Sequence, residues 1–272
     1  RAMRLHSLLS ACLAALLLAG CDEPPKDTWQ GYAEGDYVRV APIDGGLVEA
    51  IGVQRGDRVK AGDLLFRLET TSEEAALEGA RATLAETKAT LREAELDLQR
   101  KLELRKQRNV AQAELDTARA RRDRAGAATL TAASALDQAK WRLSRREGHA
   151  PADAIVQDVF FREGEFVNPS QPVVSLLPPQ NIKVRFFVPE SELSHLEEGA
   201  RVRFACSDCP QNLTGTIRFV STQAEFTPPV IYSDRSKEKL VYMAEATPDK
   251  QPELLHPGQP VTVTLATPPA AE

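Results

Sequence analysis

A motif of short β-strands occurs twice in this chain, at residues 41–68 and 150–176. Both copies begin with Ala-Pro, continue with alternating apolar residues, carry Gly-x-x-Val and end on an apolar strand. Gly56 of the first copy matches Gly164 of the second, an offset of 108 residues. Alternation bounded by Gly, Pro and Asp predicts strands and turns. One copy has too few strands to bury two faces, so we expect a single sandwich rather than two unrelated hairpins.

The residues between the two copies have the pattern of two long helices. No Pro occurs between Ser72 and Gly148, and Leu recurs every seven residues with small residues three positions later, which predicts a coiled coil. The pattern restarts after Val110, and the second β motif must rejoin the first, so we expect an antiparallel hairpin. A coiled coil that only joins copies of the chain is the alternative. The predicted seam comprises Leu77, Ala80, Leu84, Thr87, Leu91, Ala94, Leu98, Leu115, Ala118, Ala125, Thr129, Ala132, Leu136, Ala139 and Leu143.

The N-terminal residues have the form of a secretory signal. Arg4 precedes an apolar run at residues 8–18, whose 11 residues are too few to span a bilayer. The run leads into Leu-Ala-Gly-Cys at 18–21, which resembles the lipobox of bacterial lipoproteins, where the chain is cut before the Cys and the thiol is acylated. Asp22 resembles the signal that retains such proteins in the inner membrane. The alternative for Cys21 is an ordinary signal peptide with a chance Cys.

The C-terminal third alternates between apolar and polar residues. This pattern predicts short strands at 182–188, 201–204, 213–220, 239–246 and 261–265. A short helix is expected from Pro189, and an extended loop at Ala224–Pro229. Several short strands separated by turns predict a small β barrel.

Cys206 and Cys209 form a C-x-x-C motif within this third. A redox motif of the thioredoxin kind would need a helix start that is absent from the sequence. Zinc would need two further ligands, and His195 and His256 are distant in the sequence and in no ligand spacing. In an oxidising compartment a local disulfide is the simplest outcome, so we expect a disulfide and no metal site.

The duplicated motif resembles the biotinyl/lipoyl domain, in which two such halves pack with pseudo-twofold symmetry. In a carrier of that kind a Lys at a tight turn between the halves is modified, but here residues 69–149 fill that place. A split lipoyl-like domain with a coiled-coil hairpin between its halves and a barrel after them resembles the HlyD-like membrane fusion proteins. These are the periplasmic adaptors of drug-efflux and type I secretion systems. The resemblance implies an elongated α+β molecule: a split biotinyl/lipoyl-like β sandwich, an inserted antiparallel α-helical coiled-coil hairpin and a small β barrel.

The expected division of the chain follows from these features. Residues 1–20 form a lipoprotein signal peptide, 21–37 a lipid-anchored tether, 38–70 the first lipoyl-like half, 71–148 the helical hairpin, 149–179 the second half, 180–267 the β-barrel domain and 268–272 a tail.

The resemblance also assigns a role to the tip of the hairpin. In the family this tip carries Arg-x3-Leu-x6-Ser, which meets a TolC-type outer-membrane channel. The matching residues here are Arg100, Leu104 and Ala111, so the Ser hydroxyl is missing. Arg100 would donate hydrogen bonds to carbonyls or carboxylates of a partner, and Leu104 would fill a groove. The alternative for Arg100 is one more solvated side chain.

A non-enzymatic function follows from the resemblance. Acyl chains would hold the protein on the inner membrane of a Gram-negative bacterium, on the periplasmic side. Six copies would surround an inner-membrane transporter and extend their hairpins to the channel. Residues 224–229 resemble a segment of adaptors paired with ABC-type transporters, which favours an ABC over a proton-driven partner. No cofactor is implied, and the net charge of −5 does not suggest nucleic acid. A lipoprotein that only oligomerises through its coiled coil, and a lipoyl or biotinyl-type carrier, are the alternatives.

Overall fold

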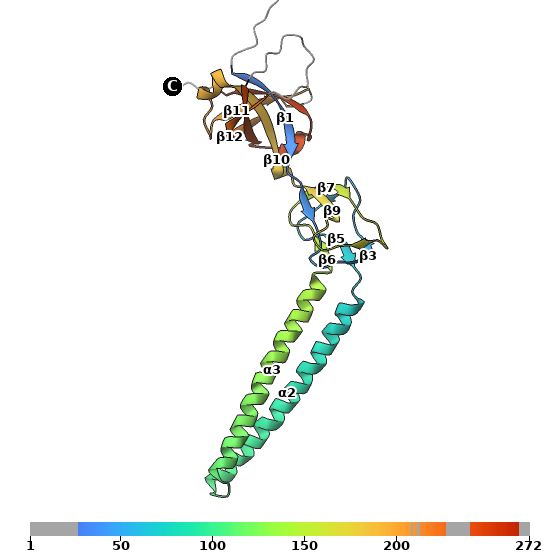
Figure 1. The fold of residues 1–272 in the computed structure, drawn as a ribbon, viewed down its shortest axis with the longest axis vertical. Coiled ribbons are helices and arrows are strands. Elements are labelled where there is room, and N and C mark those ends of the chain that lie inside the picture. The colour runs from blue at the N-terminus through green and yellow to red at the C-terminus, as the bar shows by residue number, and fades with distance from the viewer. Residues whose placement is uncertain (1–26, 208, 211–212, 227–239, 267–272) are drawn as a thin grey trace, which may run out of the picture. The chain divides into compact units, whose positions relative to one another are not determined.

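Residues 27–207, 209–210, 213–226 and 240–266 are described by the computed structural model of this chain (Figure 1). They belong to two compact units. One unit is Tyr37–Pro178, and the other combines the described residues before and after it. The expected signal peptide, Cys21 and Asp22 lie outside the described residues.

The unit Tyr37–Pro178 contains two four-stranded sheets, with strand orders β2-β9-β7-β4 and β6-β5-β3-β8. β2 to β5 precede the helices and β6 to β9 follow them, so each sheet takes strands from both halves. Exchanging every strand for its repeat counterpart converts one sheet into the other, which confirms the predicted packing of the two halves. The strands are β2 (Val38–Val40), β3 (Gly46–Ile51), β4 (Arg58–Val59), β5 (Leu64–Leu68), β6 (Glu147–His149), β7 (Ala154–Val159), β8 (Phe166–Val167) and β9 (Val174–Leu177).

The two repeated glycines make equivalent turns. Gly56 has a φ of +94° and Gly164 a φ of +87°, in the left-handed region that Gly enters without a steric penalty. The N–H of Gly56 donates to the carbonyl of Val156 at 2.8 Å, and that of Gly164 donates to the carbonyl of Val48 at 2.9 Å. Val48 and Val156 are themselves 108 positions apart, so each half makes the same bond to the other. Both valines are buried in the core between the sheets.

Two long helices are inserted between the halves: α2 (Thr71–Lys106) follows β5, and α3 (Gln112–Ser144) precedes β6. β5 and β6 pair with each other, and Phe66 lies opposite Gly148 in their ladder. This pairing brings the two ends of the insertion together and confirms the predicted antiparallel hairpin (Figure 1). The hairpin was predicted to extend to residue 148, but Glu147 and Gly148 belong to β6 because they continue the ladder with β5.

The seam between the helices has the predicted register. Every predicted seam residue is buried or half-buried, whereas Arg122, which interrupts the pattern, is exposed. The hydroxyl of Thr87 donates to the carbonyl of Leu84 at 3.1 Å. The hydroxyl of Thr129 donates to the carbonyl of Ala125 at 2.9 Å. A Thr can therefore sit in this narrow seam without leaving a polar group unsatisfied.

The second unit is a closed barrel with strand order β1-β10-β13-β12-β11-β14. Alternate residues of β10 point inward, and Val184, Phe186 and Val188 are fully buried. The alternation predicted for the C-terminal third is thereby confirmed. The elements are β1 (Thr28–Gly35), η1 (Pro179–Asn181), β10 (Ile182–Pro189), η2 (Glu190–His195), β11 (Arg201–Ala205), β12 (Thr214–Phe226), β13 (Leu240–Pro248), η3 (Pro252–Leu254) and β14 (Pro260–Leu265).

One barrel strand comes from the segment predicted to be a tether. β1 pairs with both β10 and β14, so the assignment of residues 21–37 to a tether is wrong for this strand. Trp29 is 3% exposed, and a Cβ on Gly31 would collide with the backbone carbonyl of Arg185. A closed barrel needs a strand that bonds both of its edges. That strand lies far from the others in sequence, so the local pattern gave no sign of it.

The loop predicted at Ala224–Pro229 is also partly wrong. Ala224–Phe226 form the end of β12 and pair with β13, while residues 227–229 lie outside the described residues. β12 is 13 residues long, and its ladder contains two register shifts. Such irregularities interrupt the alternation of apolar and polar residues, so the sequence pattern did not extend to the end of the strand.

Candidate functional site

The tip of the hairpin is a closed turn with two defining hydrogen bonds. α2 ends with Gln107 as its C-cap residue. The N–H of Asn109 donates to the carbonyl of Leu104 at 3.0 Å, and the N–H of Arg108 donates to that of Arg105 at 2.9 Å. This pair of bonds is the Schellman motif, which satisfies carbonyls left free at the end of a helix. The tip is therefore a defined structure rather than a loose connection.

Arg105 and Ala111 shape the other side of the turn. The guanidinium of Arg105 donates to the carbonyl of Val110 at 2.7 Å, which ties the end of α2 to the start of α3. Ala111 is the N-cap residue of α3 and offers no side-chain bond there. A Ser at this position would supply the oxygen that N-caps favour, so Ala111 removes a cap as well as a possible donor.

Arg100 and Leu104 lie one helical turn apart and so face the same side of α2. The side chain of Arg100 is 71% exposed, and Leu104 is 42% exposed. Arg100 donates to the carbonyl of Leu96 at 3.3 Å and lies 4.0 Å from the carboxylate of Asp97. Its other donors make no bond within the described part of the chain. Ala111 is exposed beyond the turn, so all three predicted contact residues are accessible.

Arg146 fastens the other end of the hairpin to the sandwich. Its guanidinium bonds the carboxylate of Glu73 at the start of α2 and donates to the carbonyl of Gly45 at 2.8 Å. Its own carbonyl accepts the N–H of Leu68 at 2.8 Å. The hydrogen bond from Arg146 holds the pKa of Glu73 below its ordinary value of 4.5, against the raising effect of burial. We call this pair, which joins both helices to the sheets, the base clamp.

Sequence reasoning missed the base clamp. Glu73 lies in the first turn of α2, and Arg146 comes just after α3 ends. The sequence pattern predicted Glu73 in the first turn of one helix and Arg146 in the last turn of the other, where such charges suit helix dipoles, so it offered a local reason for both residues. Their partnership depends on Gly45, which belongs to a distant loop, and no local pattern signals it.

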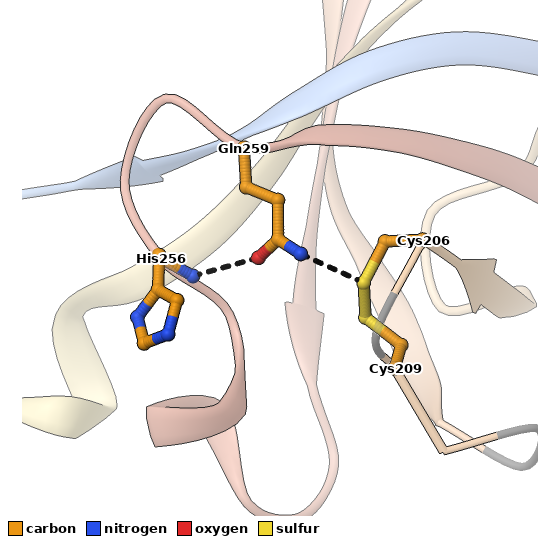
Figure 2. Close-up of a disulfide and its surroundings, with 4 residues drawn as sticks. All are labelled: Cys206, Cys209, His256 and Gln259. Carbon is orange, nitrogen blue, oxygen red and sulfur yellow. Dashed lines mark hydrogen bonds between the residues drawn. A yellow bond between two sulfur atoms is a disulfide. The ribbon is translucent and has the colours of Figure 1, made fainter.

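Cys206 and Cys209 form a disulfide beyond the end of β11, beside the loop that precedes β14 (Figure 2). The side-chain amide of Gln259 donates to the sulfur of Cys206 at 3.0 Å and accepts the backbone N–H of His256 at 3.0 Å. The loop of His256 thus lies next to the motif despite its distance in sequence. Within the described residues, no three or more His, Cys, Asp or Glu side chains gather as metal ligands would.

The hairpin matches a known protein-family model. Residues 76–145 match the model described as "RND MFP, alpha-helical hairpin domain", a range that begins within α2 and ends at Arg145, the C-cap residue of α3. None of the helices in the described ranges is both long and apolar enough to cross a bilayer.

Similar proteins cover most of the chain. A protein of Acidithiobacillus ferridurans described as a UPF0194 membrane protein is 28% identical, over 95% of this chain and 92% of its own length. The efflux pump periplasmic linker BepF of Brucella suis is 33% identical, over 64% of this chain and 43% of its own length. The structure of the membrane fusion protein Spr0693 of Streptococcus pneumoniae has the same fold, with a TM-score of 0.65, 19% identity and coverage of 89% and 99%.

Proposed function

Because this chain is a membrane fusion protein of the HlyD-like type, we propose that it links an inner-membrane transporter to a TolC-type outer-membrane channel. The observation that carries the proposal is the hairpin with its closed, accessible tip. The 36 residues of α2 make a helix of about 50 Å at 1.5 Å per residue. Such a hairpin has a thin core and a long reach, which suits contact with a distant partner.

The tip supplies the contacts that docking needs. Arg100 would donate to carbonyls or carboxylates of the channel, and Leu104 would enter a groove between its helices. Ala111 brings no hydroxyl, so we expect this adaptor to depend on the other two residues more than a relative with Ser does.

The N-terminal segment supplies the anchor. We propose that Cys21 is acylated and that Asp22 keeps the protein in the inner membrane, with the rest of the chain in the periplasm. Acyl chains contribute about 0.8 kcal/mol per buried methylene, and several chains hold a protein firmly on a bilayer. Thr28 already begins β1. The seven steps from Cys21 to Thr28 span at most about 25 Å, so the barrel unit would stay close to the membrane.

The transporter has two candidates. The resemblance of residues 224–229 to adaptors of ABC transporters supports an ABC partner. The description of the matched hairpin model as "RND MFP" favours an RND partner. Mass spectrometry of proteins that co-purify with the tagged chain from its own bacterium would identify the transporter. We propose six copies around it, following the family.

Crosslinking from the tip in living cells tests the proposed function. A Leu104→Cys variant, treated with a thiol-to-amine crosslinker, should form an adduct with an outer-membrane channel. Leu130→Cys is the matched control, because Leu130 is a 72% exposed leucine on α3 away from the tip. Adducts with other copies of the chain and none with a channel would instead support a lipoprotein that only oligomerises.

A further inference from the structure

Arg108 occupies a position that suits a different residue. It lies one residue beyond the C-cap of α2, with a φ of +64°. In a Schellman motif this position is usually Gly and sometimes Asn, because a Cβ is crowded in the left-handed region. The chain has Asn109 at the next position, where left-handed backbone is not needed. An unfavourable residue at a defined turn points to a function for its side chain.

Leu104 departs from the same motif in a second way. In a Schellman turn, the residue that follows the left-handed residue donates its N–H to a carbonyl five positions earlier. The side chains of these two residues commonly pack against each other. Here those residues are Asn109 and Leu104, so the packing partner is polar. Leu104 remains 42% exposed. The turn thus leaves one long cationic and one apolar side chain open to an external partner.

The charges around the turn single out Arg108. Residues 100–108 contain the cations Arg100, Lys101, Arg105, Lys106 and Arg108 and one acid, Glu103, in a chain of net charge −5. Four of these cations have local partners. Arg105 bonds a carbonyl, Lys106 pairs with Glu103 at 2.8 Å, and Arg100 and Lys101 lie 4.0 and 3.8 Å from one carboxylate. Across the described residues the exposed side chain of Arg108 makes no hydrogen bond or ion pair.

The helix dipole does not explain Arg108 either. Arg105 and Lys106 already lie in the last turn of α2, where cations stabilise the helix end. Arg108 comes after the helix has ended, and its carbonyl-capping role belongs to its backbone N–H, which any residue except Pro would supply.

We propose that Arg108 is a further docking residue and that the channel surface it meets carries carboxylates. This inference rests on the proposed docking of the tip. A guanidinium presents several donors in a planar fork that fits a carboxylate. With Ala111 in place of a hydroxyl-bearing residue, the tip would bind through charge and through Leu104.

The test uses the full acylated chain and the outer-membrane channel of the same bacterium, purified in detergent. Binding is measured at about 0.05 and about 0.5 M NaCl, since exposed ion pairs are screened by salt. Arg108→Gly should weaken binding roughly two- to fivefold at low salt, the effect of one exposed ion pair, and much less at high salt. Arg108→Glu should weaken binding further, and Arg108→Lys should keep most of it. Arg121→Glu, on an exposed part of α3 away from the tip, is the control.

Thermal unfolding separates docking from a structural role. Gly adopts a left-handed backbone conformation without a steric penalty. Arg108→Gly should therefore unfold at the same or a higher temperature than the wild type while binding the channel more weakly. Wild-type binding by Arg108→Gly, or a loss by Arg108→Lys equal to that of Arg108→Gly, would overturn the inference while leaving tip docking intact. No adduct from Leu104→Cys and no binding of the wild-type chain would refute the proposed function and the inference together.

Discussion

Single residues fasten the base of the hairpin to the sandwich. The base clamp joins α2, the end of α3 and the loop of Gly45 through one guanidinium. The side chains of Arg146 and Glu73 are 16% and 14% exposed, so water competes weakly for their bond. Close by, Gly148 lets β6 pass against the ring of Phe66, which is almost fully buried.

The base clamp makes stability depend on pH. Because the pKa of Glu73 is lowered in the folded state, its ionised form stabilises the fold above about pH 4.5, and this contribution is lost as pH falls through the lowered pKa. At pH 7 the wild type should exceed Glu73→Gln by about 1–2 kcal/mol in free energy of unfolding. The difference should shrink steadily in urea titrations below about pH 4.5. Glu74→Gln is the control, since that exposed carboxylate bonds the hydroxyl of Thr70 instead. A difference between wild type and Glu73→Gln that is independent of pH would contradict the assignment.

A methyl group at residue 148 should disturb the base of the hairpin. The Cβ in Gly148→Ala would overlap the ring of Phe66, so we expect a loss of about 1–3 kcal/mol in chemical unfolding. Gly79→Ala is the matched control, because nothing lies within 4 Å of a Cβ there and Ala favours the helix. The control should gain about 0.5–1 kcal/mol. Equal effects of the two substitutions would argue against close packing at Gly148.

At the scale of elements, the sequence predicted the structures that rest on a repeated pattern, namely the coiled-coil hairpin and the sandwich. Heptads set the register of the helices because they recur every seven residues, and the duplicated motif set the sandwich because its landmarks keep the same order in both copies. Elements that depend on partners distant in the sequence were not predicted. β1 is recognisable only through its bonds to β10 and β14, and the end of β12 only through β13. At the tip, the family motif located Arg100 and Leu104, but the left-handed backbone at Arg108 was visible only in three dimensions.

The narrow seam predicts an asymmetry between alanines of α3. Ala132 is 5% exposed in the seam, so Ala132→Leu should push the helices apart and lower stability by about 1–3 kcal/mol. Ala128 is exposed on the same helix, and Ala128→Leu should be nearly neutral. Circular dichroism during thermal unfolding measures both variants. If Ala132→Leu unfolded at the wild-type temperature, the close approach of the helices would be in doubt.

For the whole molecule, the proposed function depends on two features that lie far apart in the sequence. The N-terminal Cys provides the proposed attachment to a membrane, and the hairpin tip provides the proposed attachment to a channel. The sandwich and the barrel each take strands from both sides of the hairpin in the sequence. The closed barrel and the buried cores of both units make them rigid parts, which suits the proposed structural role.

Anchoring should depend on one of two N-terminal cysteines. Cys21→Ser should abolish acylation and release the protein from the membrane fraction, because no acyl chain would then enter the bilayer. Cys12→Ser, within the apolar run, should leave the protein acylated and membrane-bound. Mass spectrometry of the mature N-terminus and fractionation of the periplasm measure both effects. Membrane retention of Cys21→Ser through an uncleaved N-terminus would show a different anchor.

The claim that this chain bridges two membranes is tested most directly by affinity capture of the tagged, full-length protein from crosslinked cells. Quantitative mass spectrometry of the captured material should find an inner-membrane transporter and an outer-membrane channel together, both in reproducible proportion to the chain. Replacing Arg100 and Leu104 together by Ala should remove the channel and retain the transporter. Recovery of the chain alone, with neither membrane partner enriched over an untagged control, would contradict the account.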